Sequence, residues 1–107
     1  MNGQEVLIKV SATSRPALVA GSIAKAVRAW HRAEIQAIGA AAVHQAVKGM
    51  AIAVGFLQQD GITVAFVPRF SAGDVDGSYR TAIRFVVEVV GEGGGAKPPP
   101  SGDSPHP

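Results

Sequence analysis

The stretch that decides the fold runs from Glu34 to Val54 and reads EIQAIGAAAVHQAVKGMAIAV. Its first five residues, 34–38, read as a buried strand, and a single glycine, Gly39, follows. A long helix is predicted to begin at once, at Ala40. Alanines fill its first turn, so few side-chain atoms cover the unpaired N–H groups and the partial positive charge at the helix start. An anion could approach closely there, although small residues also suit close packing against a neighbouring strand.

Length and composition predict a single folded domain. The chain has 107 residues, of which 47% are hydrophobic and only 17% charged, and this favours a core over disorder. It contains no cysteine, which excludes disulfides, thiolate catalysis and cysteine-ligated metal sites. The N-terminus lacks the basic segment of a signal peptide, and the apolar stretches look too short to span a membrane. We therefore expect a soluble cytoplasmic protein.

Working outward from this stretch, hydrophobic periodicity predicts four strands and two helices. The strands are expected at residues 6–10, 34–38, 62–69 and 80–90, and the helices at residues 16–32 and 40–54. The inward residues predicted for the first helix are Ala20, Ile23, Ala24, Val27 and either Trp30 or His31. Those predicted for the second helix are Val43, Val47, Met50, Ala51 and Val54. Residues 91–107 are rich in glycine and proline and are predicted to be a disordered tail after a domain of residues 1–90.

The order β-α-β-α-β-β predicts an α/β fold of the α+β two-layer sandwich type. Right-handed crossovers place both helices on one face of a mixed four-stranded sheet. The first three strands are expected to be parallel, and the fourth returns antiparallel after a hairpin loop at residues 70–78. The opposite face of the sheet is then free of helices.

Three loops are predicted to converge on one edge of this sheet, because each follows the carboxyl end of a parallel strand. They are residues 11–15, the turn at Gly39 and the loop at residues 70–78. The basic residues assigned to this edge are Lys9, Arg15, Arg69 and Arg80, whereas Glu5, Glu34 and Glu88 are assigned to the opposite edge. Such an edge suits a phosphate backbone, and the alternative is that strand charges such as Arg84 and Glu88 pair across the sheet. Asp74 and Asp76 make the hairpin loop acidic, which opposes nucleic-acid binding.

Several strings of residues resemble the stage V sporulation protein S family. They are KVSA at 9–12, VAG at 19–21, AEIQAIGA at 33–40, QAVK at 45–48, and DG with RTAI between 76 and 83. The resemblance covers about residues 5–90. It implies an Alba-like fold, related to the C-terminal domain of translation initiation factor 3. It also implies a small cytoplasmic bacterial protein that is linked to sporulation, forms a homodimer and is classed with nucleic-acid binders.

The resemblance implies nucleic-acid contacts at the first βα loop, the start of the second helix and the last hairpin. Together with the basic edge, it gives as candidate binding residues Lys9, Ser11, Ser14, Arg15, Gly39, Ala40, Lys48, Arg69 and Arg80. The expected partner is DNA or RNA, held by its backbone without sequence reading.

A protein-interaction module that acts as a dimer without binding nucleic acid is the alternative function. Ala41 and Ile52 beside His44 leave an apolar strip on the second helix, and His44 and Ile52 are the predicted dimer or partner contacts. An enzyme is not predicted, because no nucleophile, base and orienting group occur together. The sequence indicates no metal, cofactor, small-molecule substrate or membrane partner.

Overall fold

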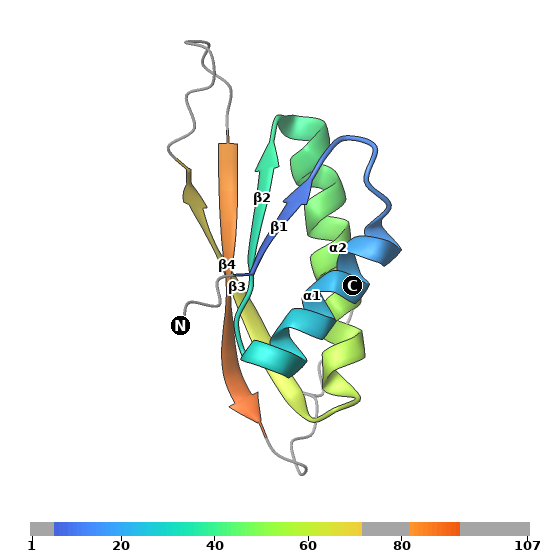
Figure 1. The fold of residues 1–107 in the computed structure, drawn as a ribbon, viewed down its shortest axis with the longest axis vertical. Helices are drawn as coiled ribbons and strands as arrows, with labels where there is room; N and C mark the ends of the chain where they lie inside the picture. The colour runs from blue at the N-terminus through green and yellow to red at the C-terminus, as the bar shows by residue number, and fades with distance from the viewer. Residues whose placement is uncertain (1–5, 72–81, 93–107) are drawn as a thin grey trace, which may run out of the picture.

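The computed structural model describes residues 6–71 and 82–92, and its six elements follow one another in the predicted order (Figure 1). They are β1 (Leu7–Val10), α1 (Pro16–Trp30), β2 (Glu34–Ile38), α2 (Ala40–Gln58), β3 (Ile62–Phe70) and β4 (Ala82–Glu92). Both helices cover one face of a mixed four-stranded sheet, so the predicted two-layer architecture is confirmed. β4 continues for two residues past the predicted strand end at Val90. Arg80, Asp74, Asp76 and the remainder of the tail lie outside the described residues.

The strands are arranged in the order β1-β2-β4-β3. β1 and β2 pair parallel, and β4 pairs antiparallel with both β2 and β3. β1, β2 and β3 therefore point the same way, as predicted, although β4 lies between β2 and β3. The carboxyl ends of these three strands all lie at one end of the sheet, the upper end in Figure 1. β1 and β3 are the edge strands, so the residues at their ends are separated by the width of the sheet.

The first helix, α1, begins as predicted and ends two residues earlier. Pro16 occupies its first turn, where a missing N–H costs nothing. It ends because His31 adopts a left-handed conformation (φ 61°) while its N–H donates to the Val27 carbonyl at 2.8 Å. Ala20, Ile23, Ala24 and Val27 are buried as predicted. Neither Trp30, which is half exposed, nor the exposed His31 joins them, so that part of the predicted stripe is wrong.

The second helix, α2, is longer than predicted and turns a different face to the core. Gly55 does not end it, and its last turn buries Leu57 completely. The buried residues are Ala42, Ala46, Gly49, Met50, Ala53 and Leu57. Of the predicted inward residues only Met50 is fully buried, whereas Val43 and Val54 are partly covered and Val47 and Ala51 are exposed.

Close contact between the helices explains this difference. A Cβ atom added at Gly49 would lie 2.6 Å from the Val19 Cγ1 atom, so only the smallest side chains fit between α1 and α2. The expectation that the apolar stretches are too short to span a membrane is wrong for α2, because the length and composition of this helix alone would suffice to cross one. Core helices of globular proteins meet the same criterion, and in this structure α2 packs on α1 and on the sheet.

Candidate nucleic-acid interface

The loop between β1 and α1 is ordered by its own hydroxyl groups. The Ser14 hydroxyl accepts from the Ser11 N–H at 2.9 Å, and the Ser11 hydroxyl accepts from the Thr13 N–H at 3.2 Å. The Ser11 Oγ atom also lies 3.2 Å from Thr13 Oγ1 and 3.3 Å from Ser14 Oγ. Ser11 and Ser14, both predicted site residues, therefore fix the shape of the loop that presents the exposed Arg15.

A side chain from α2 fastens this loop to the start of the second helix. The Gln45 Nε2 atom donates to the Ser14 carbonyl at 2.7 Å, in a partly buried position. The sequence analysis assigned Gln45 no role. Its position one turn beyond the helix start was the available signal. The bond brings two of the three predicted loops together.

The turn between β2 and α2 forms the bare helix start that the sequence predicted. Gly39 has φ 95° and ψ 155°, and no side chain caps the helix. At this cap the Val43 N–H donates to the Gly39 carbonyl at 3.0 Å, and the first turn contains no acidic residue. Ala40 and Ala41 are exposed, so the backbone N–H groups of the first turn face an open end.

The structure separates the two explanations for small residues in this turn. A Cβ atom at Gly39 would meet nothing within 4 Å, so crowding does not require the glycine and its positive φ does. Ala42, by contrast, is buried and belongs to the packed core. Packing therefore explains Ala42, and it does not explain the exposed alanines that precede it.

On the helix-free face of the sheet, three basic residues and one glutamine form a row that crosses all four strands. Lys9 is directly opposite Gln36, Gln36 is opposite Arg84, and Arg84 is opposite Arg69. We call these four residues the cationic row. Neighbouring strands lie about 4.8 Å apart, so the row extends over about 14 Å. Lys9 and Arg69 were predicted site residues, whereas Gln36 and Arg84 were not, because their place in the row depends on the strand order.

The centre of the cationic row is partly neutralised. The Arg84 Nη1 atom lies 3.0 Å from the Glu34 Oε1 atom, and both side chains are about one-third exposed. The predicted alternative of charges pairing across the sheet is thus realised, with Glu34 as the acid. Glu34 therefore lies beside the row rather than at a remote edge. Lys9 and Arg69, at the two ends, are exposed and form no ion pair with any described residue.

A hollow of about 300 Å³ joins the cationic row to the first loop. Its lining residues, from β1, β2 and the loop, are Lys9, Val10, Ser11, Ala12, Gln36 and Ile38. Lys48 lies elsewhere, exposed on α2 in the helix layer, so the structure does not bring it to the row. His44 and Ile52 are exposed on the same helix. Arg80 lies outside the described residues, and its predicted role stays a prediction.

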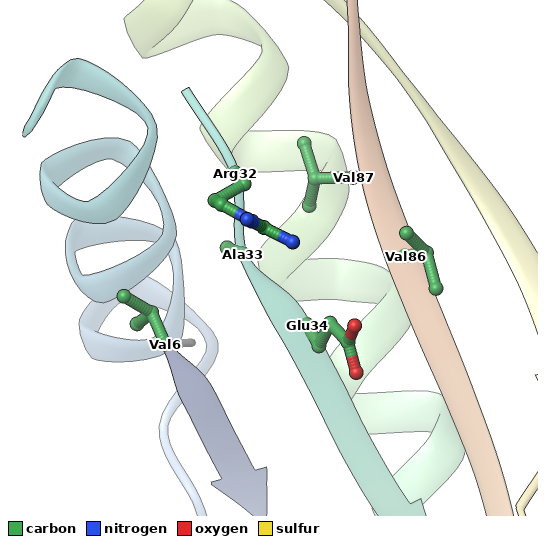
Figure 2. A pocket seen from close by; sticks show the side chains of 6 residues that line it. All are labelled: Val6, Arg32, Ala33, Glu34, Val86 and Val87. Atoms are coloured by element: carbon green, nitrogen blue, oxygen red, sulfur yellow. The ribbon is translucent and has the colours of Figure 1, made fainter. Parts of the chain in front are cut away.

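A smaller cavity of about 80 Å³ lies towards the other end of the sheet (Figure 2). Its lining residues are Val6, Arg32, Ala33, Glu34, Val86 and Val87. Figure 2 shows the Arg32 side chain above the Glu34 carboxylate, with Val86 and Val87 on the neighbouring strand β4. A space of this size holds a few water molecules at most, and it shares only Glu34 with the surroundings of the cationic row.

A comparison with known protein families shows which family this chain belongs to. Residues 6–90 match the family model of stage V sporulation protein S. The chain belongs to the stage V sporulation protein S family. Membership makes it a sporulation-related regulatory protein, and the family is not a known family of enzymes. In residues 6–71 and 82–92, no three His, Cys, Asp or Glu side chains gather into a metal site.

Proposed function

We propose that this member of the stage V sporulation protein S family is a cytoplasmic regulator that binds DNA or RNA by the phosphate backbone, without reading sequence. The cationic row carries the proposal. Lys9 and Arg69 are exposed and unpaired among the described residues, and Gln36 adds an amide donor between them. Arginine, lysine and amide side chains are the groups that position proteins on phosphates.

The loops at the upper end of the sheet extend this surface with further donors. Arg15 is exposed in the ordered first loop, and the N–H groups at Ala40 and Ala41 begin a helix without a cap. Backbone N–H groups at a helix start and serine hydroxyls both bind phosphate oxygens in nucleic-acid complexes. None of these groups reads base edges, so the expected binding is insensitive to sequence.

The proposal is tested by fluorescence anisotropy at low salt, with a labelled 20-base-pair DNA and a 20-nucleotide RNA. The double variant Lys9→Gln/Arg69→Gln removes the two ends of the cationic row and should weaken binding at least tenfold. The double variant Lys25→Gln/Arg32→Gln makes the same change in net charge away from the row and should weaken binding less than threefold. Equal losses in the two variants would show that net charge alone attracts the nucleic acid.

A second candidate function, dimerisation through α2, is favoured by the composition of that helix's outer face. Its exposed residues are Ala40, Ala41, His44, Val47, Lys48, Ala51, Ile52, Gly55 and Phe56. Lys48 is the single charge among them, and small residues such as Ala51 and Gly55 allow another helix to approach closely. Two copies could therefore pack α2 against α2, with His44 and Ile52 in contact with the partner.

Light scattering coupled to size-exclusion chromatography tests this candidate. The wild-type protein should have twice the 10.9 kDa mass of one chain, and Ile52→Glu should be a monomer. Leu18→Glu is the matched control, because it places the same charge at an exposed apolar position on α1. A monomeric wild-type protein, or loss of the dimer in the Leu18→Glu control, would contradict an α2 interface.

A further inference from the structure

The free edge of β1 is the starting point for an inference that does not rest on nucleic-acid binding, although Lys9 and Arg15 belong to both surfaces. β1 pairs only with β2, so its other side has no strand partner among the described residues. The Glu34 N–H donates to the Val6 carbonyl at 2.9 Å, which shows that the Val6 backbone faces β2. Backbone direction alternates along a strand, so Leu7 and Lys9 direct their N–H and C=O groups to the free side. An unpaired edge of this kind is a template for another strand.

A groove accompanies this edge along the flank of α1. It consists of two hollows, of about 340 and 330 Å³, that share Ile8 of β1 and Ser22 of α1. The other residues of the upper hollow are Lys9, Thr13, Ser14, Arg15, Leu18 and Val19. Those of the lower hollow are Val6, Lys25, Ala26, Ala29 and Trp30. We call the two hollows together the β1 groove.

The β1 groove has the dimensions and surface of a peptide site. Leu18 is 64% exposed and Trp30 is 50% exposed, and they mark its two ends. They are twelve positions apart along α1, which is about 18 Å, the length of five or six residues in an extended strand. Its floor is apolar, with Ile8, Val19 and Ala26, and unpaired backbone groups lie beside it. Main-chain hydrogen bonds to the edge with side chains in adjacent pockets are the basis of recognition by strand addition.

The charges around the groove select its occupant. Lys9, Arg15 and Lys25 line it, and no carboxylate of a described residue does. A second copy of this chain on the same edge would bring these cations against their own equivalents, which is unfavourable. A nucleic acid would leave the apolar floor and the edge amides unused. An extended, acidic protein segment satisfies the backbone edge, the apolar floor and the cations together.

We propose that the free edge of β1 and the β1 groove bind an extended segment of another protein in which apolar and acidic residues alternate. The segment adds as a fifth strand beside β1. Its apolar side chains enter the groove over α1, and the alternate side chains, the carboxylates, project to the helix-free face beside Lys9. Arg15 and Lys25 line the groove itself and add to the positive charge that attracts the acidic segment. A regulatory protein would thereby have a protein-binding surface separate from the α2 face.

The chain provides its own reporter for this proposal. Trp30 is the single tryptophan of the protein and lines the β1 groove. The probe is the unlabelled octapeptide Val-Glu-Val-Glu-Val-Glu-Val-Glu, titrated at low salt without nucleic acid. It should shift the Trp30 emission to shorter wavelength and saturate. The same peptide with every backbone N–H methylated cannot donate to the edge in either strand direction and should bind at least tenfold more weakly, and a Val-Lys octapeptide should not bind.

Variants locate the site. Ser22→Tyr fills the point that the two hollows share and should weaken probe binding at least tenfold, whereas Ala17→Tyr adds the same side chain at an exposed position of α1 outside the groove and should not. Arg69→Gln, far across the sheet, should leave binding of the octapeptide unchanged. Failure of peptide binding can therefore be distinguished from failure of nucleic-acid binding, which depends on Arg69. The proposal is overturned if the probe does not bind, if the N-methylated or lysine peptide binds equally, or if both tyrosine variants behave alike. A wild-type dimer that Ser22→Tyr alone dissociates would also overturn it, since a second copy would then occupy the edge.

Discussion

At the scale of single residues, Gly39 shows what sequence can and cannot reveal about this site. Its position between a buried strand and an alanine-rich helix start was visible in the sequence, and two explanations were left open. The backbone angles decide between them, because φ 95° with ψ 155° lies in a region that is essentially restricted to glycine. The open space around Gly39 shows that conformation, not crowding, requires it. No pattern of neighbouring residues indicates a backbone angle directly.

The first prediction concerns this residue. Gly39→Ala should lower the free energy of unfolding by about 1–3 kcal/mol, because alanine must adopt a strained backbone conformation there. Gly55→Ala, in the interior of α2 with open space around it, is the control and should raise stability by up to about 1 kcal/mol. Chemical denaturation monitored by circular dichroism measures both. A Gly39→Ala variant as stable as the wild type would show that the turn does not need this conformation.

At the scale of elements, the strands were predictable and the buried face of α2 was not. Period-two alternation located every strand to within one or two residues at each described end, because one face of the sheet is covered. In α2 the valines suggested an inward stripe, but the close approach of α1 selects Ala42, Ala46 and Gly49 instead. The distance between two packed helices depends on the side chains of both, and the sequence of α2 alone gives no information about those of α1. The helix was predicted to stop at residue 54, just before Gly55, but burial of Leu57 extends it to Gln58.

The second prediction tests the packing of the two helices. Gly49→Ala should destabilise the fold by about 1–3 kcal/mol, because the added methyl group would lie 2.6 Å from Val19 Cγ1 and 3.2 Å from the Pro16 carbonyl oxygen. Adding Val19→Ala removes the Cγ1 clash but keeps the Val19 Cβ atom, which would lie 2.8 Å from the new methyl group, so Gly49→Ala should cost less in that background than in the wild type without becoming neutral. Thermal and chemical unfolding of the four proteins gives the coupling between the two positions. Independent, additive effects would indicate that α1 and α2 are farther apart at this point.

At the scale of the whole molecule, the strand order creates the candidate site. The direction of β1, β2 and β3 followed from the chain's connections, and so did the position of their carboxyl ends at one end of the sheet. That β4 lies between β2 and β3 could not be derived from local pattern, because alternation does not indicate which strands are neighbours. The order places Arg84 in the cationic row and Glu34 against it, and neither contact was predicted. The family resemblance and the basic edge identified Lys9 and Arg69, but they did not identify Gln36 and Arg84, which lie between them in the cationic row.

The third prediction uses the acid beside the row. Glu34→Gln releases Arg84 from its ion pair and removes a negative charge, so DNA affinity should rise about fivefold, which corresponds to about 1 kcal/mol for charges close together in water. Stability should change by no more than about 1 kcal/mol, because the pair is partly exposed. Glu88→Gln removes the same charge from the same face opposite Ala65, away from the row, and should have a smaller effect. Equal gains from the two variants would argue against a localised site.

The salt dependence of DNA binding tests the central claim most directly. Each phosphate that the protein neutralises contributes about −0.9 to the slope of log affinity against log salt concentration for duplex DNA. Contacts from Lys9, Arg15 and Arg69 predict a wild-type slope of about −3, and Lys9→Gln/Arg69→Gln should reduce its magnitude by about 2. A wild-type affinity that does not change with salt, or a slope that the double variant leaves unaltered, would contradict binding of the phosphate backbone by the cationic row.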